Sequence, residues 1–385
     1  MPRPRKLIVS KVLSDSDSGK LEGKWVTESQ LKFPVIDYNC DVYYKDEGGG
    51  EKLLLKFRKK CFTNTQIRTG WKSYKDLAKP SRGRGASAGP IDMESVYWKK
   101  RNIVNTSKWS TGYLNPEGNK MKDELEKLSL EELQNKVNEM EIKYKEEDFN
   151  NKGTLIQLII KKNNGISKMK VNNQVASNPI GFYESSKNFS DLPCRLTHFT
   201  RTNYDKYKDG LSFIKHIDNM FKKLIPESHE KQLERANKKG HLKIPDTSFS
   251  TITINRNFRT AVHKDAGDFK EGFGNLTVIE RGKYHGGYTV FPQFGVGVDV
   301  RSGDFLAMDV HQWHSNTAIY ETVEDKEYND KLEKVYNDNP DVGTVGLDKN
   351  YTRLTFVCYL RQKILDCPNE IDKRFLGPSG HGKIL

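Results

Sequence analysis

A run of short strand-like segments in the second half of the chain limits the fold more than any other feature. From Ser248 onward, segments rich in Val, Ile, Thr and Phe alternate with glycine turns: FSTITIN, GNLTVIERG, GGYTVFP, VGVDVRSGDFLAMDV and RLTFVCYL. Many short strands in a limited length of chain are typical of a small barrel or jelly-roll. A charged stretch at 320–350 interrupts the pattern, and we expect an inserted helix or loop there.

The preceding part of the chain carries helical patterns instead. In LSLEELQNKVNEMEI the apolar residues recur at helical spacing, and Ser129 with Glu132 forms a capping box at its start. After a polar stretch, TLIQLIIKK predicts a second short helix. The segment 203–239 has another apolar helical face, which Pro226 ends. We predict a loop for the polar residues 165–190, and an α+β protein as a whole.

The two short helices at 119–165 resemble a SAP motif, a small two-helix DNA-binding module. The resemblance rests on their leucines and on the terminal Lys161 and Lys162. A plain helical hairpin remains the alternative, and the acidic residues in the connecting loop weigh against DNA binding.

Charge and hydropathy restrict the class of protein. The 385 residues are 35% hydrophobic and carry a net charge of +13. No run of about 18 apolar residues exists, so we expect no membrane span. The basic start MPRPRKLIVSKVLSDSDS has an apolar run too short for a secretory signal. We therefore expect an intracellular protein that is not secreted, and a nuclear one if its source is a eukaryote.

The positive charge is concentrated in one tract. Residues 51–110 hold fifteen Lys or Arg against four Asp or Glu. The tract also holds aromatic residues, namely Trp71, Tyr74, Tyr97, Trp98 and Trp109. Cations bind phosphates and rings stack on bases, so the tract predicts a nucleic-acid surface. The alternative is that the rings form a core and the lysines keep it soluble.

Two arginines in this tract are candidates for substrate binding. Arg82 and Arg84 lie in the loop KPSRGRGASAGP. Glycine allows close approach of a backbone and arginine supplies forked donors, so the loop could wrap a phosphate backbone. It could equally be a flexible linker.

The five cysteines are scattered, without a CxxC pair. Neither a disulfide framework nor a cysteine zinc site is indicated. We expect free or buried thiols in a reducing compartment.

The segment RTAVHKDAGDF carries the first chemical signal. His263 and Asp265 follow the strand STITI, and residues two apart in an extended chain point to one side. Two histidines with one carboxylate form the facial triad of non-haem Fe(II) oxygenases. The missing histidine is His311 or His314 in DVHQWHSN, 48 or 51 residues after His263.

A further signal is Arg353, at the start of RLTFVCYL. Strand alternation places it on the same side as Thr355, Val357 and Tyr359. An arginine on the inner side of a strand is costly unless it is paired. The carboxylate of a small ligand, held through two hydrogen bonds, would supply that pairing.

The order HxD, GDFLAMD, His and strand-borne Arg resembles the 2-oxoglutarate/Fe(II)-dependent dioxygenases. Their fold is a double-stranded β-helix, which the resemblance implies for residues 166–385. The segments NRNFRTAVHKDAGDFKEGFGNLTVIERG and GGYTVFPQFGVGVDVRSGDFLAMDVHQWHSN are similar to the TET/JBP branch in particular. That branch oxidises the 5-methyl group of cytosine or thymine in nucleic acid. The resemblance covers 248–316 well, continues at 351–360 and is vague before 190.

The resemblance implies roles for individual residues. His263, Asp265 and His314 would bind Fe(II), and Arg353 would bind 2-oxoglutarate. His314 fits the third-ligand pattern better than His311 does, although strand register alone leaves both open. The 39 residues from His314 to Arg353 exceed the usual spacing, so the arginine assignment requires 320–350 to be a surface insertion.

Two further residues are candidates for contacting the substrate. Asp268 matches a position where some members of the branch contact the target base, and a carboxylate accepts hydrogen bonds from the cytosine amino group. Its alternative is an ordinary turn carboxylate. Asn255, at the end of FSTITIN, is the second candidate.

The sequence thus predicts three regions. They are a basic, aromatic-rich region at 1–118, the SAP-like hairpin at 119–165, and the dioxygenase domain at 166–385. The expected activity is hydroxylation of 5-methylcytosine or thymine in DNA with Fe(II), 2-oxoglutarate and O₂, on a flipped or single-stranded base. A hydroxylase of protein side chains and a non-catalytic DNA-binding protein are the alternatives. The oligomeric state is open, with a monomer as the expectation.

Overall fold

The computed structural model describes residues 3–77, 79–81, 84–90, 110–114, 116–144, 146–170, 175–185, 193–336 and 349–369. The chain divides into two compact units, residues 1–102 with 172–385, and residues 103–171. No helix in these ranges has the length and hydrophobicity needed to cross a bilayer.

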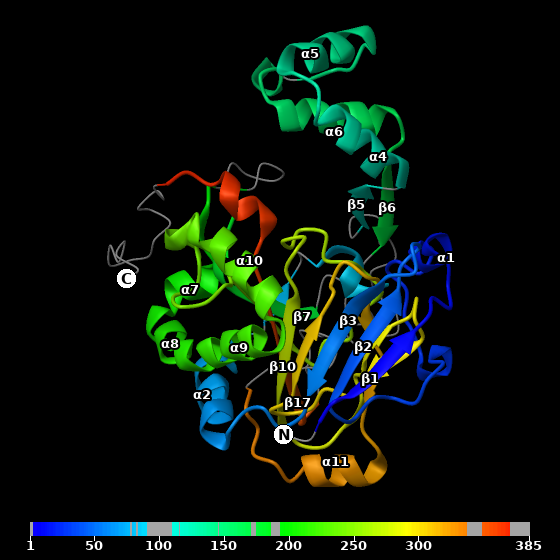
Figure 1. Ribbon diagram of the computed structural model, residues 1–385. Helices are drawn as coiled ribbons and strands as arrows, with labels where there is room; N and C mark the ends of the chain where they lie inside the picture. The colour runs from blue at the N-terminus through cyan, green and yellow to red at the C-terminus, as the bar shows by residue number, and fades with distance from the viewer. Residues whose placement is uncertain are drawn as a thin grey trace, which may run out of the picture. The chain divides into compact units, whose positions relative to one another are not determined.

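A large mixed sheet forms the centre of the first unit (Figure 1). Its strands run in the order β1-β2-β3-β14-β10-β17-β9-β7-β4, and β8 pairs with β7. Their bounds are β1 (Arg5–Val9), β2 (Cys40–Lys45), β3 (Glu51–Arg58), β4 (Pro80–Ser81), β7 (Val175–Tyr183), β8 (Arg195–Leu196), β9 (Thr251–Arg256), β10 (Gly274–Arg281), β14 (Phe305–Met308) and β17 (Thr352–Tyr359). Only the β1–β2 pairing within this sheet is parallel.

The prediction of a loop at 165–190 is wrong. The segment contains β6 (Ile166–Lys170) and the nine-residue β7. β7 reads VASNPIGFY and has no clean alternation, because side chains on both of its faces are buried. It becomes a strand by pairing with β9, and Ser177 lies opposite Asn255.

Smaller strands cover one face of the large sheet. They are β11 (His285–Gly286), β12 (Thr289–Phe291), β13 (Val296–Val298), β15 (Ser315–Asn316) and β16 (Ile319–Tyr320). β12 pairs with β13 and β15, and β11 pairs with β16. Phe291 and Val296 from this small sheet pack with Leu276, Leu306 and Met308 of the large one. The two sheets therefore enclose a common interior.

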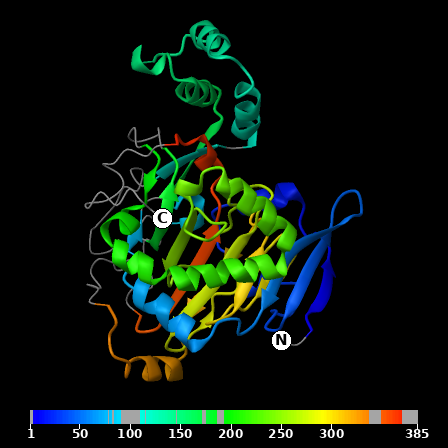
Figure 2. The same cartoon turned by 60° about the vertical axis from the view of Figure 1, so that its left-hand side comes forward.

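Helices cover the opposite face of the large sheet, as Figure 2 shows. They are α2 (Asn64–Tyr74), α7 (His198–Thr202), α8 (Tyr204–Asp209), α9 (Leu211–Leu224) and α10 (Pro226–Asn237). The helix predicted within 203–239 is confirmed, and Pro226 opens α10 where α9 ends. Phe213, Ile217 and Phe221 of α9 are fully buried against the sheet, each worth roughly 1.5–3 kcal/mol of burial free energy.

Packing at this interface shows that part of the prediction of a nucleic-acid surface at 51–110 is wrong. Tyr74 is fully buried, so its ring belongs to the core and is not available to stack on bases. Trp71 is partly buried and packs against the same core. Tyr97, Trp98 and Trp109 lie outside the described residues.

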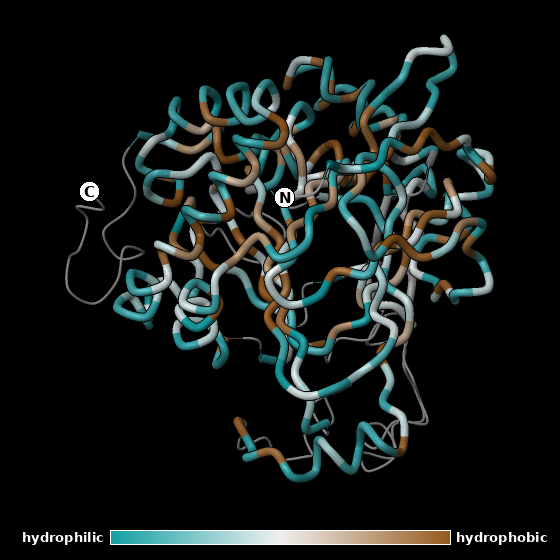
Figure 3. Tube along the Cα trace, turned by 60° about the horizontal axis from the view of Figure 1, so that its bottom comes forward, coloured by the Kyte–Doolittle hydropathy of each residue, from teal (hydrophilic) through white to brown (hydrophobic). Residues whose placement is uncertain are grey.

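Hydropathy follows this layering. In Figure 3 hydrophobic positions recur along the packed strands and helices, and many loops are hydrophilic. The remaining elements of this unit are α1 (Asp15–Gly19), η1 (Glu28–Gln30), η2 (Gly85–Ala88), η5 (Gly240–Leu242), α11 (Val323–Asn329) and η7 (Gln362–Asp366). α11 is a short helix inside the charged stretch 320–350.

In its described residues, the second unit consists of three α-helices and a two-stranded ribbon. It contains β5 (Ser110–Leu114), α4 (Pro116–Leu125), α5 (Leu130–Glu139), η4 (Glu146–Asp148), α6 (Lys152–Lys162) and β6. Leu133, Val137, Leu155 and Ile159 form its core. Both predicted helices and the capping box at Ser129 are confirmed.

The capping box gives a measurable prediction for this unit. Ser129→Ala removes the hydroxyl that accepts from the Glu132 N–H, so we expect α5 to lose about 1 kcal/mol of local stability. Faster amide hydrogen exchange in α5, with unchanged exchange in β9 and β17, would be the signature. Equal exchange in α5 of the variant and the wild type would contradict it.

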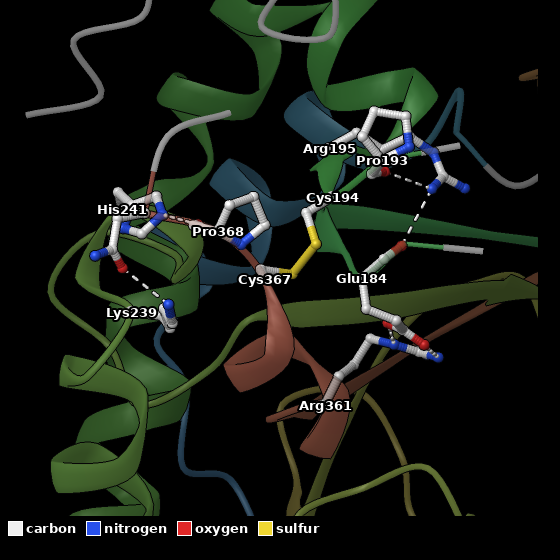
Figure 4. The surroundings of a disulfide bond; sticks show 10 residues. Glu184, Pro193, Cys194, Arg195, Lys239, His241, Arg361, Cys367 and Pro368 are labelled. Carbon is white, nitrogen blue, oxygen red and sulfur yellow. Dashed lines mark hydrogen bonds and ion pairs between the residues drawn. A yellow bond between two sulfur atoms is a disulfide. The ribbon is translucent and has the colours of Figure 1, made fainter. Parts of the chain in front are cut away.

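Cys194 and Cys367 form a disulfide, so the expectation of five free thiols is wrong for this pair (Figure 4). Cys40, Cys61 and Cys358 are free. The partners are 173 residues apart in sequence, and the fold brings their Cα atoms to 5.9 Å. Spacing could not reveal the pair, because the contact depends on the packing of the end of η7 beside β8.

Candidate active site

Three of the predicted residues meet at one end of the interior. The ligand atoms of His263, Asp265 and His314 all lie within 4.8 Å of one another. His263 Nε2 is 3.6 Å from Asp265 Oδ1, and His314 Nε2 is 3.5 Å from Asp265 Oδ2. This is the only such cluster of metal-binding side chains among the described residues.

The backbone fixes these side chains in place. His263 and His314 exchange two N–H···O=C hydrogen bonds of 3.0 Å, and the Asp265 N–H donates to the Val310 carbonyl. The HxD segment and the segment after β14 are thereby joined like neighbouring strands. A pair that is 51 residues apart in sequence thus faces one carboxylate.

The imidazole rings present their Nε2 atoms to the cluster. Each Nδ1 contacts a backbone carbonyl, that of Ala261 at 2.7 Å for His263 and that of Gln312 at 2.9 Å for His314. When Nδ1–H donates to the carbonyl, Nε2 carries a free lone pair. This is the tautomer that can bind a metal through Nε2.

Electrostatics also favour cation binding. Burial, assisted by the neighbouring His314, lowers the pKa of His263 to about 4. Burial opposes ionisation of Asp265, yet hydrogen bonding to His314 and the charges of both histidines hold its pKa below the usual value. Burial also acts against protonation of His314, but its hydrogen bond to Asp265 raises its pKa. One imidazole is therefore neutral and the carboxylate is ionised at neutral pH, a donor set suited to a divalent metal.

Arg353 supplies an unpaired cation in the same interior. It is 2% exposed, and its Nε and Nη2 atoms are buried without a hydrogen-bond partner among the described residues. Its backbone is fixed between β9 and β10, where its N–H donates to Asn257 Oδ1 at 2.7 Å. A Cβ added at Gly287 would lie 3.4 Å from Nε, so glycine leaves room beside the guanidinium. The orphaned donors fit the carboxylate of a small dianion such as 2-oxoglutarate.

A row of polar side chains continues along the inner face. Asn255 joins Ser177 to Thr355, because it accepts from Ser177 Oγ and donates to Thr355 Oγ1 at 3.1 Å. Thr253 contacts the Tyr359 hydroxyl at 3.0 Å. The amide of Asn255 is therefore occupied by intramolecular hydrogen bonds.

Arg84 enters this row from the loop before η2. Its Nη1 donates to Thr253 Oγ1 at 3.4 Å, and its buried Nε has no partner among the described residues. The loop is tied to the metal-site segment, since Ala261 N–H donates to the Ser87 carbonyl. Arg84 thus lies inside the site, whereas Arg82 is outside the described residues.

Asp268 borders the same site. It is 7% exposed, its N–H donates to the Asp265 carbonyl at 3.2 Å, and its Oδ2 is buried without a partner among the described residues. Burial, with the charge of Asp265, raises the pKa of Asp268 well above the usual value. A buried acceptor with no protein partner suits a ligand that brings a hydrogen-bond donor.

His311 is not part of the cluster. Its Nε2 is directed to the Phe269 carbonyl at 3.3 Å. The structure therefore brings His314, and not His311, to His263 and Asp265.

Sequence reasoning missed Arg361 and Glu184 beside Asp268. Alternation along RLTFVCYL, extended by one residue, places Arg361 on the side of Tyr359, so a signal for it existed. Glu184 follows β7 in a stretch predicted as loop and carries no local signal.

Comparison with known proteins defines the class. Residues 178–362 match a family model described as the oxygenase domain of the 2OGFeDO superfamily, which uses Fe(II) and 2-oxoglutarate. The model is named Tet_JBP, and the matched residues make up just under half of the chain. This segment is therefore similar to the Tet_JBP oxygenase domains.

Two curated relatives each match about half of the chain. The chain is 32% identical over 195 residues to the bifunctional helicase and thymine dioxygenase JBP2 of Leishmania braziliensis, covering 51% of this chain and 15% of that protein. It is 31% identical over 196 residues to thymine dioxygenase JBP1-A of Trypanosoma cruzi, covering 50% of this chain and 20% of that protein. The chain thus matches only a fraction of either relative. A solved structure of NgTET1 in complex with 5mC DNA covers 90% of this chain and 88% of its own at 9% identity, with a TM-score of 0.40.

Proposed function

We propose that the protein is an Fe(II)- and 2-oxoglutarate-dependent dioxygenase that hydroxylates the 5-methyl group of a pyrimidine in DNA, either 5-methylcytosine or thymine. The observation that carries the proposal is the cluster of His263, Asp265 and His314 in one interior with the unpaired guanidinium of Arg353, within a segment similar to the Tet_JBP oxygenase domains. Bound iron and 2-oxoglutarate would together supply O₂ activation.

Each of the side chains in the interior has a separate proposed role. His263, Asp265 and His314 would hold the metal. Arg353 would bind a carboxylate of 2-oxoglutarate, because its buried Nε and Nη2 atoms have no partner among the described residues. The side chains of His263 and His314 are 16% and 6% exposed, which limits the access of water to the cluster.

The fold proposed for this domain is a double-stranded β-helix, in which the large sheet and the small sheet of β12, β13 and β15 are the two layers. Facing sheets with the cluster and Arg353 between them support this assignment. The finer domain limits of 1–118, 119–165 and 166–385 remain part of the proposal. So does a SAP-like role in DNA binding for α5 and α6.

DNA is the proposed partner, and the target base enters flipped from a duplex or from a single strand. A base inside a duplex cannot reach side chains held between two sheets. The net charge of +13 favours a polyanionic substrate over a neutral peptide. A DNA substrate places the protein inside the cell, in the nucleus of a eukaryote, and it would act as a monomer.

Nucleoside mass spectrometry tests the proposal. The full chain is incubated with Fe(II), 2-oxoglutarate and DNA that carries 5-methylcytosine and thymine, with a peptide library as the parallel substrate. We expect oxidised 5-methylcytosine or thymine, and succinate in proportion. If both bases stay unmodified while a peptide gains oxygen, the substrate assignment is wrong.

Asp268 is the proposed contact to the target base. Asp268→Asn keeps the shape and replaces one carboxyl oxygen by an amide nitrogen, so we expect kcat/KM on methylated DNA to fall on the order of 10- to 100-fold, the cost of leaving one buried hydrogen-bonding group of the base unpaired. Succinate formation without DNA should stay near the wild-type rate, since the metal cluster is untouched. Equal loss of both activities would place Asp268 in the metal site instead.

A further inference from the structure

The loop that carries Asp268 is held by one short segment of chain. Phe269 N–H donates to the Leu360 carbonyl at 2.8 Å, and Gln362 N–H donates to the Gly267 carbonyl at 2.9 Å. Between these two bonds, Asp268 and Arg361 lie opposite each other as an antiparallel bridge. Two backbone hydrogen bonds and a bridge thus join residues 360–362 to the loop 267–269.

The side chain of Arg361 forms an ion pair with Glu184. Its Nε and Nη2 atoms donate to the two carboxylate oxygens of Glu184, as Figure 4 shows. The guanidinium also lies 5.1 Å from the centre of the Tyr183 ring. A Cβ added at Gly267 would be 3.9 Å from Arg361 Nη2, so the cation lies directly beside the Asp268 loop.

The setting makes this ion pair stronger than a surface pair. The side chains of Arg361 and Glu184 are only 24% and 16% exposed, which limits screening by water and salt. Two parallel hydrogen bonds also fix the orientation of the guanidinium, which a single contact would not. Although burial acts in the opposite direction, the hydrogen bond from Arg361 holds the pKa of Glu184 below its usual value.

The Cys194–Cys367 disulfide links the segments that carry Arg195 and Arg361. Cys367 ends the turn η7 that follows Arg361, and Cys194 precedes Arg195 at the start of β8. Arg195 donates to the backbone carbonyl of Glu184 at 3.1 Å. Phe269 of the Asp268 loop packs in the same apolar cluster as both cysteines. An ion pair thus joins Glu184 to Arg361, and a covalent bond joins Cys194 to Cys367.

We infer that Arg361 is a positioning residue for base recognition: its ion pair with Glu184, closed by the Cys194–Cys367 disulfide, holds Asp268 at the substrate side of the metal cluster. The inference rests on the proposed function for the identity of the substrate. Arg361 acts through the backbone of residues 267–269. The metal residues share one bond with this loop, from the Asp268 N–H to the Asp265 carbonyl. They are otherwise held by the pair between His263 and His314 and by the bond from the Asp265 N–H to the Val310 carbonyl.

Glu184→Gln is the decisive variant, because it keeps the shape of the carboxylate and removes its charge. We expect KM for methylated DNA to rise about tenfold or more, through misplacement of Asp268. Succinate formation without DNA and the KM for 2-oxoglutarate should stay within about twofold of wild type, since most of the bonds that hold the metal cluster and Arg353 are separate. Exchanging the two charges, Glu184→Arg with Arg361→Glu, should recover part of the DNA affinity.

Amide hydrogen exchange provides a second test of the same variant, and it needs no substrate. In Glu184→Gln the amides of Phe269 and Gln362 should exchange hydrogen faster, and the amide of His263 should not. Cys194→Ser should accelerate the same two amides. Asp246→Asn serves as the matched control, because it removes an exposed ion pair with Lys215 at a positive-φ position that asparagine tolerates.

The outcomes separate the two ideas. Unchanged exchange at Phe269 and Gln362 in Glu184→Gln overturns the inference, as does a parallel loss of succinate formation and DNA oxidation. If the wild type forms succinate yet oxidises no pyrimidine, the proposed function fails, and the exchange data alone still decide whether the ion pair holds the loop.

Discussion

His263→Ala should abolish both oxidation of DNA and formation of succinate from 2-oxoglutarate. The ring is one of two imidazoles that face Asp265, and without it only one histidine and one carboxylate would remain to hold a metal. Loss of metal activation is worth several kcal/mol, so we expect a decrease on the order of 10³-fold or more. Succinate release measured with and without DNA checks this, and Fe(II) binding should weaken in parallel.

His311→Ala is the matched control. His311 is three residues from His314, but its ring is directed to the Phe269 carbonyl. We expect succinate formation within about twofold of wild type, because the variant removes at most one neutral hydrogen bond. If His311→Ala were as inactive as His263→Ala, the third ligand would be His311 and the cluster would have been assigned wrongly.

Arg353→Met should separate ligand binding from stability. Without the guanidinium, 2-oxoglutarate loses two charge-assisted hydrogen bonds, so its KM should rise about 100-fold or more. The protein without ligand should behave in the opposite way. Arg353 is buried with two unpaired nitrogen atoms, and replacing such a cation by an apolar side chain is commonly neutral or stabilising by roughly 1–4 kcal/mol.

Thermal unfolding of the ligand-free protein tests the second half of this prediction. The Tm of Arg353→Met should equal or exceed that of wild type, and 2-oxoglutarate should raise only the wild-type Tm. Arg353→Lys keeps the charge but lacks the fork, and should bind 2-oxoglutarate with intermediate strength. A large fall in Tm for Arg353→Met would mean that the guanidinium stabilises the fold through its own contacts.

Local periodicity was enough to predict much of the site. The spacing of His263 and Asp265 defines one face of an extended segment, and the cluster has that geometry. Alternation along RLTFVCYL places Arg353 and Thr355 on the inner face, while Leu354 and Phe356 pack under the helices, as the structure has them. Short-range patterns suffice where a strand has one polar and one apolar face.

What the sequence could not provide depends on contacts between distant segments. β7 is buried on both faces and therefore lacks the alternation that would identify it. The choice between His311 and His314 depends on the hydrogen bonds that join His263 to His314. The role of Glu184 depends on its ion pair with Arg361, which is far along the chain. No local sequence pattern predicts such a pair.

The Cys194–Cys367 bond also has a topological consequence. The covalent ring that it closes contains all three metal-cluster residues and Arg353, with α9, α10 and α11. A protease that cuts once anywhere inside this ring opens a peptide bond without separating the fragments. The nicked chain would still migrate as one molecule until a reductant is added, and the halves of the site would stay tethered at high effective concentration.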